Sequence, residues 1–522
     1  MSIHPSRQAY VEEEETTLDL ASLPTDTNYQ IRDPNTGQSQ HASTVLGEFA
    51  RKRRANALAV PTDDARVRQE LRSRGEPITL FGERKEDRRD RLRELLLGEQ
   101  EGGADEDESM ADADEDGEGD EEGEFYIEGS QALLAARRDI AKYSLPRATK
   151  RLGYQKQESK IPVQSHVKHR KAIKEKLGGV ELFGSQIASE RPVSIVRFAP
   201  NGEVVASGDW GGSVKLLDVP NLETKMVLRG HTGMVGGISW FPGATLPGST
   251  VSPDSLNLAT SAADNEIYLW SLSQDTPIST LSGHSARICR IDFHPSGKYL
   301  ASASYDTTWR LWDVATTTEL LLQEGHSKEV YTVAFNEDGS LVASAGLDSI
   351  GRIWDMRTGR TAMILEGHVG PIHAMDWSCD GYRVMTGSSD GFAKCWDMRA
   401  VRETASIGAH VGGVSDLRWY KGTDGPLSGH QLQADTTMTN GDSNDDSPPQ
   451  LQPKKAGTFL VSSGFDKAVN IFSADDWALC KSLTGHDGTV LSVDVTTDAK
   501  FIASCGRDRT VKLWARDDME GI

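Results

Sequence analysis

The sequence has few cysteines and no long apolar run, and both absences narrow the class of protein. Its 522 residues include only five cysteines, and no two of them are spaced as CxxC. An odd number of cysteines without that spacing indicates neither a disulfide framework nor a zinc site. We therefore expect no bound metal and small buried thiols on strands. No stretch is apolar for long enough to cross a membrane.

Charge is unevenly distributed along the chain. The first residues, MSIHPSRQAYVEEEE, lack the basic and apolar regions of a secretory signal, so we expect an intracellular, soluble protein. Residues 101–128 hold about fifteen acids and no base. Residues 136–178 carry about thirteen Lys and Arg against three acids. The formal net charge of −21 therefore conceals a basic segment, residues 136–178, which we call the basic island. A phosphate is attracted by the charge of this local segment and not by the net charge of the chain.

The sequence also lacks the motifs of an enzyme, with no phosphate loop and no metal-binding cluster. One stretch, residues 283–313, does contain His284, Ser302 and Asp306, the residue types of a serine-hydrolase triad. Equivalent sets, however, recur six times along the chain. A hydrolase needs one triad beside a pocket and an oxyanion hole, so the recurrence favours a structural role and predicts no enzyme and no cofactor.

A repeat of 42 residues explains these recurring sets. Gly-His occurs at 230–231, 283–284, 325–326, 367–368 and 485–486, with Ala409-His410 as a variant. In the four unbroken copies a Trp follows the His by 28 positions, with Ser or Thr ten and Asp six positions before that Trp. Within each unit, short β-branched and aromatic segments alternate with Gly- and Pro-containing turns. The period and this pattern are those of a four-stranded propeller blade.

The repeat resembles the WD-repeat β-propeller family. That resemblance implies that each blade contains a hydrogen-bonded tetrad of Asp, His, Ser or Thr, and Trp. The four complete sets are His284, Ser302, Asp306 and Trp312; His326, Ser344, Asp348 and Trp354; His368, Thr386, Asp390 and Trp396; and His486, Ser504, Asp508 and Trp514. Two further copies use His231 with Trp270, and His410 with Phe472.

We predict an all-β fold, a seven-bladed propeller over about residues 180–516. The first blade, residues 193–219, is degenerate: Gly211 replaces the Asp, Leu217 replaces the Trp, and the His is missing. The preceding VELFGSQIAS is expected to supply the outer strand of the last blade, closing the ring and hiding its edges. Two hairpins are lengthened, one by residues 242–257 and one by residues 422–457.

Upstream of the propeller, residues 60–99 indicate two short helices. Thr62 and the acids after it start the first helix and Gly75 ends it, and the second spans about residues 83–97. About 40 residues cannot build a core alone. Two interpretations remain open, a solvated, partly helical tail or a helical hairpin that docks on a partner. The docking residues would be Leu80, Phe81, Leu92 and Leu95.

The basic island indicates one or two helices that contact RNA. QALLAARRDIAKYSL is amphipathic, and Pro146 is expected to break the pattern. Dense Lys and Arg neutralise phosphates, while Tyr143 and Tyr154 are placed to stack on unpaired bases. A nuclear-import signal is the alternative, and the two roles can coexist. The RNA-binding candidates are Arg137, Arg138, Arg147, Lys150, Arg151, Lys168, Arg170 and Lys171.

The predicted domain boundaries follow from these shifts in composition. They are a disordered N-terminal tail (1–50), a helical motif (51–99), an acidic disordered linker (100–130), a basic helical linker (131–179) and the propeller (180–522), with a disordered insert at 422–457.

The stretch VPTDDARVRQELRSRGEPITLFGERKEDRRDRLRELL resembles the splicing factor motif of pre-mRNA processing proteins. Residues 125–157 are similar to the linker that follows this motif. With the propeller, the sequence is identified as a member of the pre-mRNA-processing factor four family, the WD-repeat proteins of the spliceosomal U4/U6 small nuclear ribonucleoprotein (snRNP).

The resemblance implies a nuclear, non-enzymatic scaffold of the U4/U6 snRNP and of the U4/U6·U5 tri-snRNP. Implied partners are U4/U6 small nuclear RNA, a companion U4/U6 protein, a cyclophilin of that particle and other tri-snRNP proteins, with no membrane and no small-molecule substrate. The alternative is a WD-repeat adaptor in another nuclear assembly, such as ribosome biogenesis or a ubiquitin ligase. Only the propeller supports that alternative.

Overall fold

A computed structural model of the chain describes residues 64–74, 85, 88–89, 91–93, 95–96, 127, 129–427 and 453–516. All of them belong to one compact unit, residues 55–522. Leu80 and Phe81, the predicted N-terminal tail, nearly all of the acidic linker and most of the 422–457 insert lie outside the described residues.

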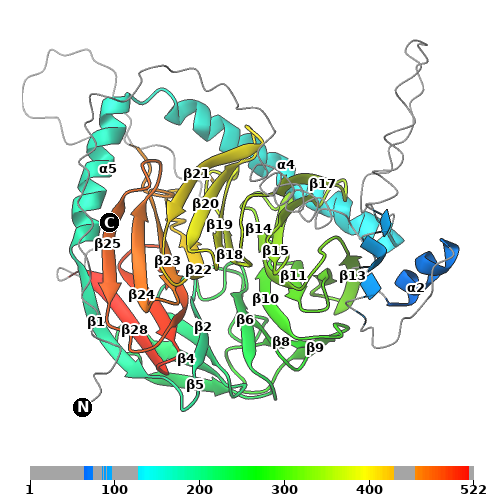
Figure 1. The fold of residues 1–522 in the computed structure, drawn as a ribbon. Coiled ribbons are helices and arrows are strands. Elements are labelled where there is room, and N and C mark those ends of the chain that lie inside the picture. The colour runs from blue at the N-terminus through cyan, green and yellow to red at the C-terminus, as the bar shows by residue number, and fades with distance from the viewer. Residues whose placement is uncertain are drawn as a thin grey trace, which may run out of the picture. The chain divides into compact units, whose positions relative to one another are not determined.

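The described strands form seven four-stranded antiparallel sheets, arranged as the blades of a propeller (Figure 1). Within each sheet the strands pair in chain order, except where the last blade is closed. The predicted seven-bladed propeller is therefore confirmed.

The first three blades span residues 193–323. Blade 1 contains β2 (Val193–Phe198), β3 (Val204–Asp209), β4 (Val214–Asp218) and β5 (Thr224–Leu228). Blade 2 contains β6 (Val235–Trp240), β7 (Leu258–Ala262), β8 (Glu266–Trp270) and β9 (Ser279–Ser282). Blade 3 contains β10 (Ile288–Phe293), β11 (Tyr299–Ser304), β12 (Trp309–Asp313) and β13 (Thr318–Gln323).

The remaining blades complete the ring. Blade 4 contains β14 (Val330–Phe335), β15 (Leu341–Gly346), β16 (Gly351–Asp355) and β17 (Thr361–Leu365). Blade 5 contains β18 (Ile372–Trp377), β19 (Arg383–Ser388), β20 (Phe392–Asp397) and β21 (Arg402–Gly408). Blade 6 contains β22 (Val414–Trp419), β23 (Phe459–Gly464), β24 (Ala468–Ser473) and β25 (Leu479–Thr484), and blade 7 contains β26 (Val490–Val495), β27 (Phe501–Gly506) and β28 (Thr510–Arg516).

The ring is closed by a strand from the N-terminal side of the propeller. β1 (Val180–Ile187) pairs antiparallel with β28, so that Val180 lies opposite Arg516 and Ile187 opposite Thr510. β1 is thus the fourth strand of blade 7, as the sequence predicted. The pairing ties the two ends of the propeller together and covers the outer edge of β28.

Apolar side chains fill the spaces between neighbouring blades. One cluster joins Ile267 and Leu269 of blade 2 to Leu300 and Trp312 of blade 3, all of them almost fully buried. The inner strands are buried on both sides because each sheet is packed between two others. Their sequences are therefore largely apolar. Most of the stability therefore comes from contacts between sheets.

Three helices of the described part of the chain precede the propeller: α2 (Asp64–Ser73), α4 (Gln131–Glu158) and α5 (Val163–Gly178). α4 begins at Ser130, whose hydroxyl accepts a hydrogen bond from the Leu133 N–H. None of the described helices is long and apolar enough to cross a membrane.

The expected break at Pro146 is wrong, because α4 continues through it. Proline removes one hydrogen bond inside a helix and strains the preceding turn. Both halves of α4 are nevertheless attached to the propeller, through buried Ile140 before Pro146 and the ion-paired Arg151 after it. These contacts hold the two halves in one helix.

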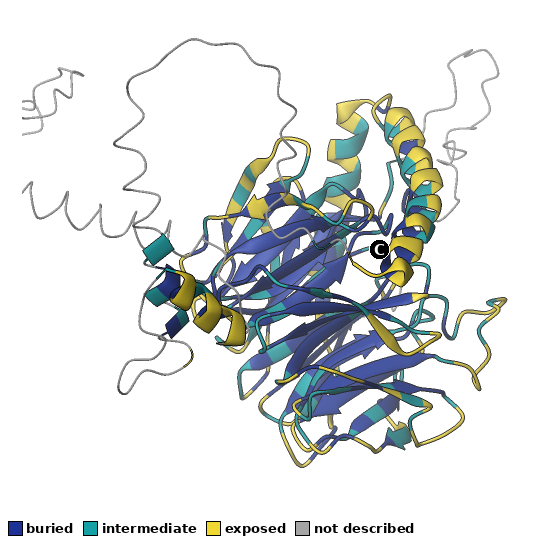
Figure 2. Ribbon diagram, turned by 90° about the vertical axis from the view of Figure 1, so that its right-hand side faces the viewer, coloured by how far each residue is buried: buried dark blue, intermediate teal, exposed yellow. Residues whose placement is uncertain are grey.

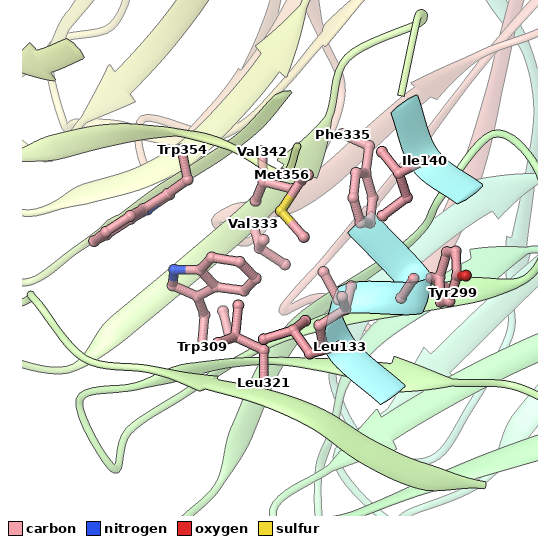
Figure 3. Packing of buried hydrophobic residues seen from close by; sticks show 14 of the residues in the cluster. Leu133, Ile140, Tyr299, Trp309, Leu321, Val333, Phe335, Val342, Trp354 and Met356 are labelled. Carbon is pink, nitrogen blue, oxygen red and sulfur yellow. The ribbon is translucent and has the colours of Figure 1, made fainter. Parts of the chain in front are cut away.

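α4 and α5 lie against the edge of the propeller that carries the turns between first and second strands and between third and fourth strands. We call this edge the helix face. Leu133 and Ile140 point from α4 toward Leu321, Tyr299 and Phe335 (Figure 3). Figure 2 shows that the strands are buried while the outward sides of the helices are exposed. The opposite edge, which carries the Gly-His loops, is called the tetrad face.

Candidate functional site

The candidate triad of blade 3 is a buried four-residue network. His284 Nδ1 lies 2.7 Å from Asp306 Oδ2, and His284 Nε2 lies 2.7 Å from Ser302 Oγ. Trp312 Nε1 donates to the same Ser302 Oγ at 2.8 Å. Because an indole can only donate, the Ser302 hydroxyl gives its own hydrogen to His284 Nε2, and His284 Nδ1–H donates to Asp306.

The same geometry recurs in the other three tetrads that share the 28-residue spacing from His to Trp. In each, the His ring contacts the Asp and the hydroxyl at 2.7–3.0 Å, and the Trp donates to that hydroxyl at 2.8–2.9 Å. The residues are His326, Asp348, Ser344 and Trp354; His368, Asp390, Thr386 and Trp396; and His486, Asp508, Ser504 and Trp514.

Two further blades carry variants of the network. In blade 2, His231 contacts Asp264 and Thr260 at 2.8 Å each, and Trp270 completes the set. In blade 6, His410 contacts Ser462 at 2.8 Å and Asp466 at 2.9 Å, but Phe472 takes the place of the Trp and has no N–H to donate. The Ser462 hydroxyl therefore lacks the indole partner that Ser302 has.

Blade 1 replaces its missing His and Asp with a different pair. Asp209 is buried and accepts a hydrogen bond from the Ser189 hydroxyl at 2.6 Å. Its other oxygen accepts the backbone N–H groups of Gly211 and Ser213 at 2.8 and 2.9 Å. One carboxylate thus fixes the same turn that the His–Asp pair fixes elsewhere. Sequence reasoning missed Asp209 because it stands two positions before the residue that aligns with the usual Asp.

The tetrads hold their carboxylates in the charged form. Burial acts to raise the pKa of Asp306, but hydrogen bonds from His284 and Thr308 outweigh it and hold the pKa at about 2. Burial likewise acts on Asp348, where the charge and hydrogen bond of His326 bring the net pKa below its usual range. An ionised acceptor makes each His–Asp hydrogen bond charge-assisted and therefore stronger than a neutral one.

The tetrads fix the turns of the blades, and their hydroxyls are not accessible to a substrate. Ser302 and Ser344 are fully buried, and each hydroxyl is hydrogen-bonded to both a histidine ring and an indole N–H. The buried carboxylate, ring and hydroxyl satisfy one another, so the network links the turn of each blade to its strands.

The basic helices are fastened to the propeller by several of the predicted RNA-binding residues. Arg147 donates from Nη2 to the Glu337 carbonyl at 2.9 Å. Arg151 forms an ion pair with Asp338 at 2.8 Å and also donates to the Asp380 carbonyl at 3.3 Å. α4 therefore crosses successive turns on the helix face of blades 4 and 5.

Two further candidates are also occupied by intramolecular contacts. Arg137 is buried and donates to the Ile127 carbonyl at 3.0 Å. Arg170 of α5 donates to the carbonyls of Thr458 and Ala474 at 3.1 and 3.0 Å, and it forms an ion pair with Asp475. The aromatic candidates are partly covered as well: Tyr143 packs on His294 and the Tyr154 hydroxyl donates to the Asp424 carbonyl.

The remaining four candidates are exposed cations on the same helices. They are Arg138, Lys150, Lys168 and Lys171. The predicted island thus divides into a clamping half, which faces the propeller, and a solvent-facing half. Sequence spacing alone did not separate the two, because the direction of each side chain depends on where α4 lies.

The helical motif forms a small core of its own. Leu92 is fully buried beside Val67 and Leu71, and Leu95 packs against this cluster. Of the four predicted docking residues, Leu92 is therefore occupied inside the motif. From the sequence, two helices of about 40 residues were expected to be too small to form a core. That expectation considered the helices alone, without their attachment to the propeller.

That attachment is made on the tetrad face, at the connection between blades 3 and 4. Arg89 donates to the backbone carbonyl of the tetrad residue His326 at 2.8 Å. Arg66 of α2 lies 3.6 Å from the carboxylate of Glu324. The motif and the basic helices therefore contact opposite edges of the propeller.

A polar cavity of about 310 Å³ lies among the innermost strands. Its charges are largely paired with one another: Arg197 contacts Asp416 at 3.0 Å, and Lys421 lies 3.7 Å from Asp376. Burial acts to raise the pKa of Asp416, but its arginine neighbours lower it overall. Among the described residues, no three His, Cys, Asp or Glu side chains gather where they would hold a metal ion.

Two family models match the chain. The model described as pre-mRNA processing factor 4 (PRP4) like matches residues 67–95, which include most of α2 and Leu92. The model of the WD domain, G-beta repeat, matches 183–218, 222–271, 275–313, 318–355, 359–397 and 477–515. It passes over residues 398–476, where the structure contains blade 6 with its long insert and Phe472.

The relative that covers most of the chain decides the family. The U4/U6 small nuclear ribonucleoprotein PRP4 of Saccharomyces cerevisiae is 36% identical over 502 residues, which are 95% of this chain and 98% of that protein. The chain belongs to the Prp4 family. It is accordingly a WD-repeat protein related to pre-mRNA splicing factors.

Other relatives of the Prp4 family member match over shorter stretches. A WD repeat-containing protein of Schizosaccharomyces pombe is 43% identical over 261 residues, and the U4/U6 small nuclear ribonucleoprotein Prp4 of Homo sapiens is 38% identical over 211 residues. The matched regions cover 55% and 40% of those two proteins. The chain thus spans about half the length of these relatives or less.

Proposed function

We propose that this Prp4 family member is a non-enzymatic scaffold subunit of the U4/U6 and U4/U6·U5 small nuclear ribonucleoproteins, and that it acts in the nucleus in spliceosome assembly. The observation that carries the proposal is the end-to-end match to the yeast U4/U6 protein, helical motif and propeller together. The buried tetrads support the non-enzymatic part, because their hydroxyls are closed off from any substrate.

The proposed scaffold joins protein contacts to RNA contacts. The exposed cations Arg138, Lys150, Lys168 and Lys171 are the proposed contacts to U4/U6 small nuclear RNA. Each one that meets a phosphate gains affinity through counterion release. Their clamped neighbours serve a different purpose, since they hold α4 and α5 on the propeller and so fix the positions of the exposed cations.

The proposed protein partners are a companion U4/U6 protein, a cyclophilin of that particle and other tri-snRNP proteins. The helical motif is the proposed docking element, with Leu80 and Phe81 as its contact residues; Leu95 lies at the rim of the motif core. Replacement of Leu80 and Phe81 by Ala should weaken association while leaving the propeller's melting temperature unchanged.

The deciding experiment is recovery of the full chain from nuclear extract followed by sequencing of the RNA that copurifies with it. Enrichment of U4 and U6 RNA is the expected result. Enrichment of pre-ribosomal RNA, or of no RNA at all, would support the other nuclear assemblies and contradict the proposal.

A further inference from the structure

The outward side of α4 carries three exposed leucines in a line. Leu134, Leu145 and Leu152 are 41%, 55% and 51% exposed. Leu134 and Leu152 are eighteen residues apart, five turns of helix, so they point in the same direction. Leu145 lies eleven residues after Leu134, about three turns, and shares their side. We call these three residues the leucine stripe.

Small residues separate the leucines along the same side. Ala141 and Ala148 stand seven and fourteen residues after Leu134, and both are only partly covered. Large side chains alternating with small ones leave holes in which side chains of a second helix can sit. The side of α4 about a third of a turn away from the stripe is already in use, because Leu133 and Ile140 are buried against the propeller. α4 is thus apolar on two sides, and only one is covered by the described part of the chain.

The exposed charges beside the stripe are all positive. Arg138 and Lys156 are again eighteen residues apart and lie along one flank, with Lys142 next to them. The only acids of α4, Asp139 and Glu158, are each paired with a lysine of the propeller side, Lys298 and Lys454, at 3.2 Å. They therefore do not balance the cations of this flank, and a complementary surface would be acidic.

We propose that the leucine stripe is the docking site for an amphipathic α-helix of a partner protein, whose apolar seam packs on the leucines and whose Asp and Glu face Lys142 and Lys156. Burial of three half-exposed leucines gives a protein helix an apolar contact that a phosphate backbone cannot use. This site goes beyond the scaffold role, and it does not depend on which nuclear particle contains the chain.

The test is site-specific photo-crosslinking of the full chain in nuclear extract. A photoreactive p-benzoylphenylalanine replaces Leu145 in one variant and Leu246 in a matched control, since Leu246 is 42% exposed on the insert of blade 2. We expect a crosslinked product from position 145 only, and this product should resist ribonuclease but be degraded by protease. Mass spectrometry of the product should identify a partner peptide with apolar residues at heptad spacing flanked by acidic residues. No product, a ribonuclease-sensitive product, or a crosslinked peptide without that pattern would each contradict the proposal.

A binding measurement on the crosslinked peptide completes the test. The synthetic peptide should bind the Leu145→Gln/Leu152→Gln chain at least tenfold more weakly than the unchanged chain. It should bind the Leu246→Gln chain with the same affinity as the unchanged chain. Lys142→Gln/Lys156→Gln should flatten the salt dependence of binding. Equal affinity of the leucine variant would overturn the proposal, provided that its thermal melt matches the unchanged chain. Copurifying U4 and U6 RNA is scored separately, so that failure of the docking site and failure of the scaffold role are distinguishable.

Discussion

Arg151 and Asp338 form a 2.8 Å ion pair that joins helix α4 to a turn of blade 4 across 187 positions of the sequence. The Asp338 side chain is 1% exposed and that of Arg151 is 14% exposed. The second carboxylate oxygen of Asp338 is buried without a hydrogen-bond partner, so this carboxylate depends on Arg151. The pair is therefore a structural clamp in a segment whose composition alone points to RNA.

We expect Arg151→Ala to destabilise the protein by about 3 kcal/mol, because it leaves a buried carboxylate without its counter-charge. The matched control is Lys150→Ala, because the Lys150 side chain is exposed and its loss should change the free energy of unfolding by less than about 0.5 kcal/mol. Urea denaturation measures both variants. Equal stabilities would mean that the clamp contributes nothing.

The tetrads should contribute to folding rather than to chemistry. Asp306→Ala removes the acceptor of the buried His284 ring and should cost roughly 1–3 kcal/mol. Thermal melts compare the variant with the unchanged chain. An unaltered midpoint, or a hydrolase activity that disappears in Ser302→Ala, would contradict this assignment.

A comparison between two blades isolates the contribution of the indole. Ser302→Ala leaves both His284 and the buried Trp312 N–H without a partner, whereas Ser462→Ala affects His410 but no indole, because Phe472 replaces the Trp. We expect the first substitution to cost about 1 kcal/mol more than the second. The difference in free energy of unfolding is the measurement, and costs of equal size would exclude a net contribution from the indole bond.

Stability should fall on mild acidification because of a histidine beneath α4. Burial lowers the pKa of His294 to about 4, against the hydrogen bond to the Gly339 carbonyl, which acts to raise it; the nearby charge of Arg147 lowers it further. The folded state therefore favours the neutral ring. The stability that this provides is complete above the unfolded pKa of about 6.5 and is lost as the pH falls toward 4, at most about 3 kcal/mol.

The variant His294→Phe removes this titration while keeping a ring among Tyr143, Tyr299 and Phe335. Its free energy of unfolding should depend less on pH between 6.5 and 4 than that of the unchanged chain. The tetrad carboxylates, such as Asp306, titrate at lower pH, between their unfolded pKa of about 3.9 and the folded value of about 2, and do not interfere. Parallel pH profiles of the two proteins would show that His294 does not titrate with unfolding.

RNA affinity should depend on the exposed half of the basic island alone. Replacement of Lys150, Lys168 and Lys171 by Gln should flatten the slope of log affinity against log salt for U4/U6 RNA by up to about one unit per contacting residue. The same salt titration on Arg170→Gln, whose side chain is occupied by Thr458 and Ala474, should leave the slope nearly unchanged. A larger effect of Arg170→Gln would place the RNA on the clamping residues instead.

The parts of this structure that repeat were predictable from the sequence. The fixed interval between His284 and Trp312 identified the blades, and the strand-like VELFGSQIAS before blade 1 identified the ring closure. Blade 6 was also recognisable, although Phe472 replaces its Trp. Periodicity suffices here because each tetrad is local to one blade.

The parts of the structure that do not repeat were harder to predict from the sequence. Helix α4 runs through Pro146 because contacts with turns almost two hundred residues away hold it together, and no local pattern contains that information. For the same reason charge density identified the basic island but not the direction of each side chain. Arg147 and Lys150 are three residues apart, and one is a clamp while the other is exposed.

Closure of blade 7 by β1 also fixes the order of events during translation. β1 leaves the ribosome more than three hundred residues before β28, its only partner in the sheet. Until β28 has been made, β1 has no strand to pair with in its sheet, and blade 7 cannot close the ring. Premature termination before β28 therefore leaves the propeller open and β1 without its partner, and an unpaired edge strand is a template for pairing with another chain.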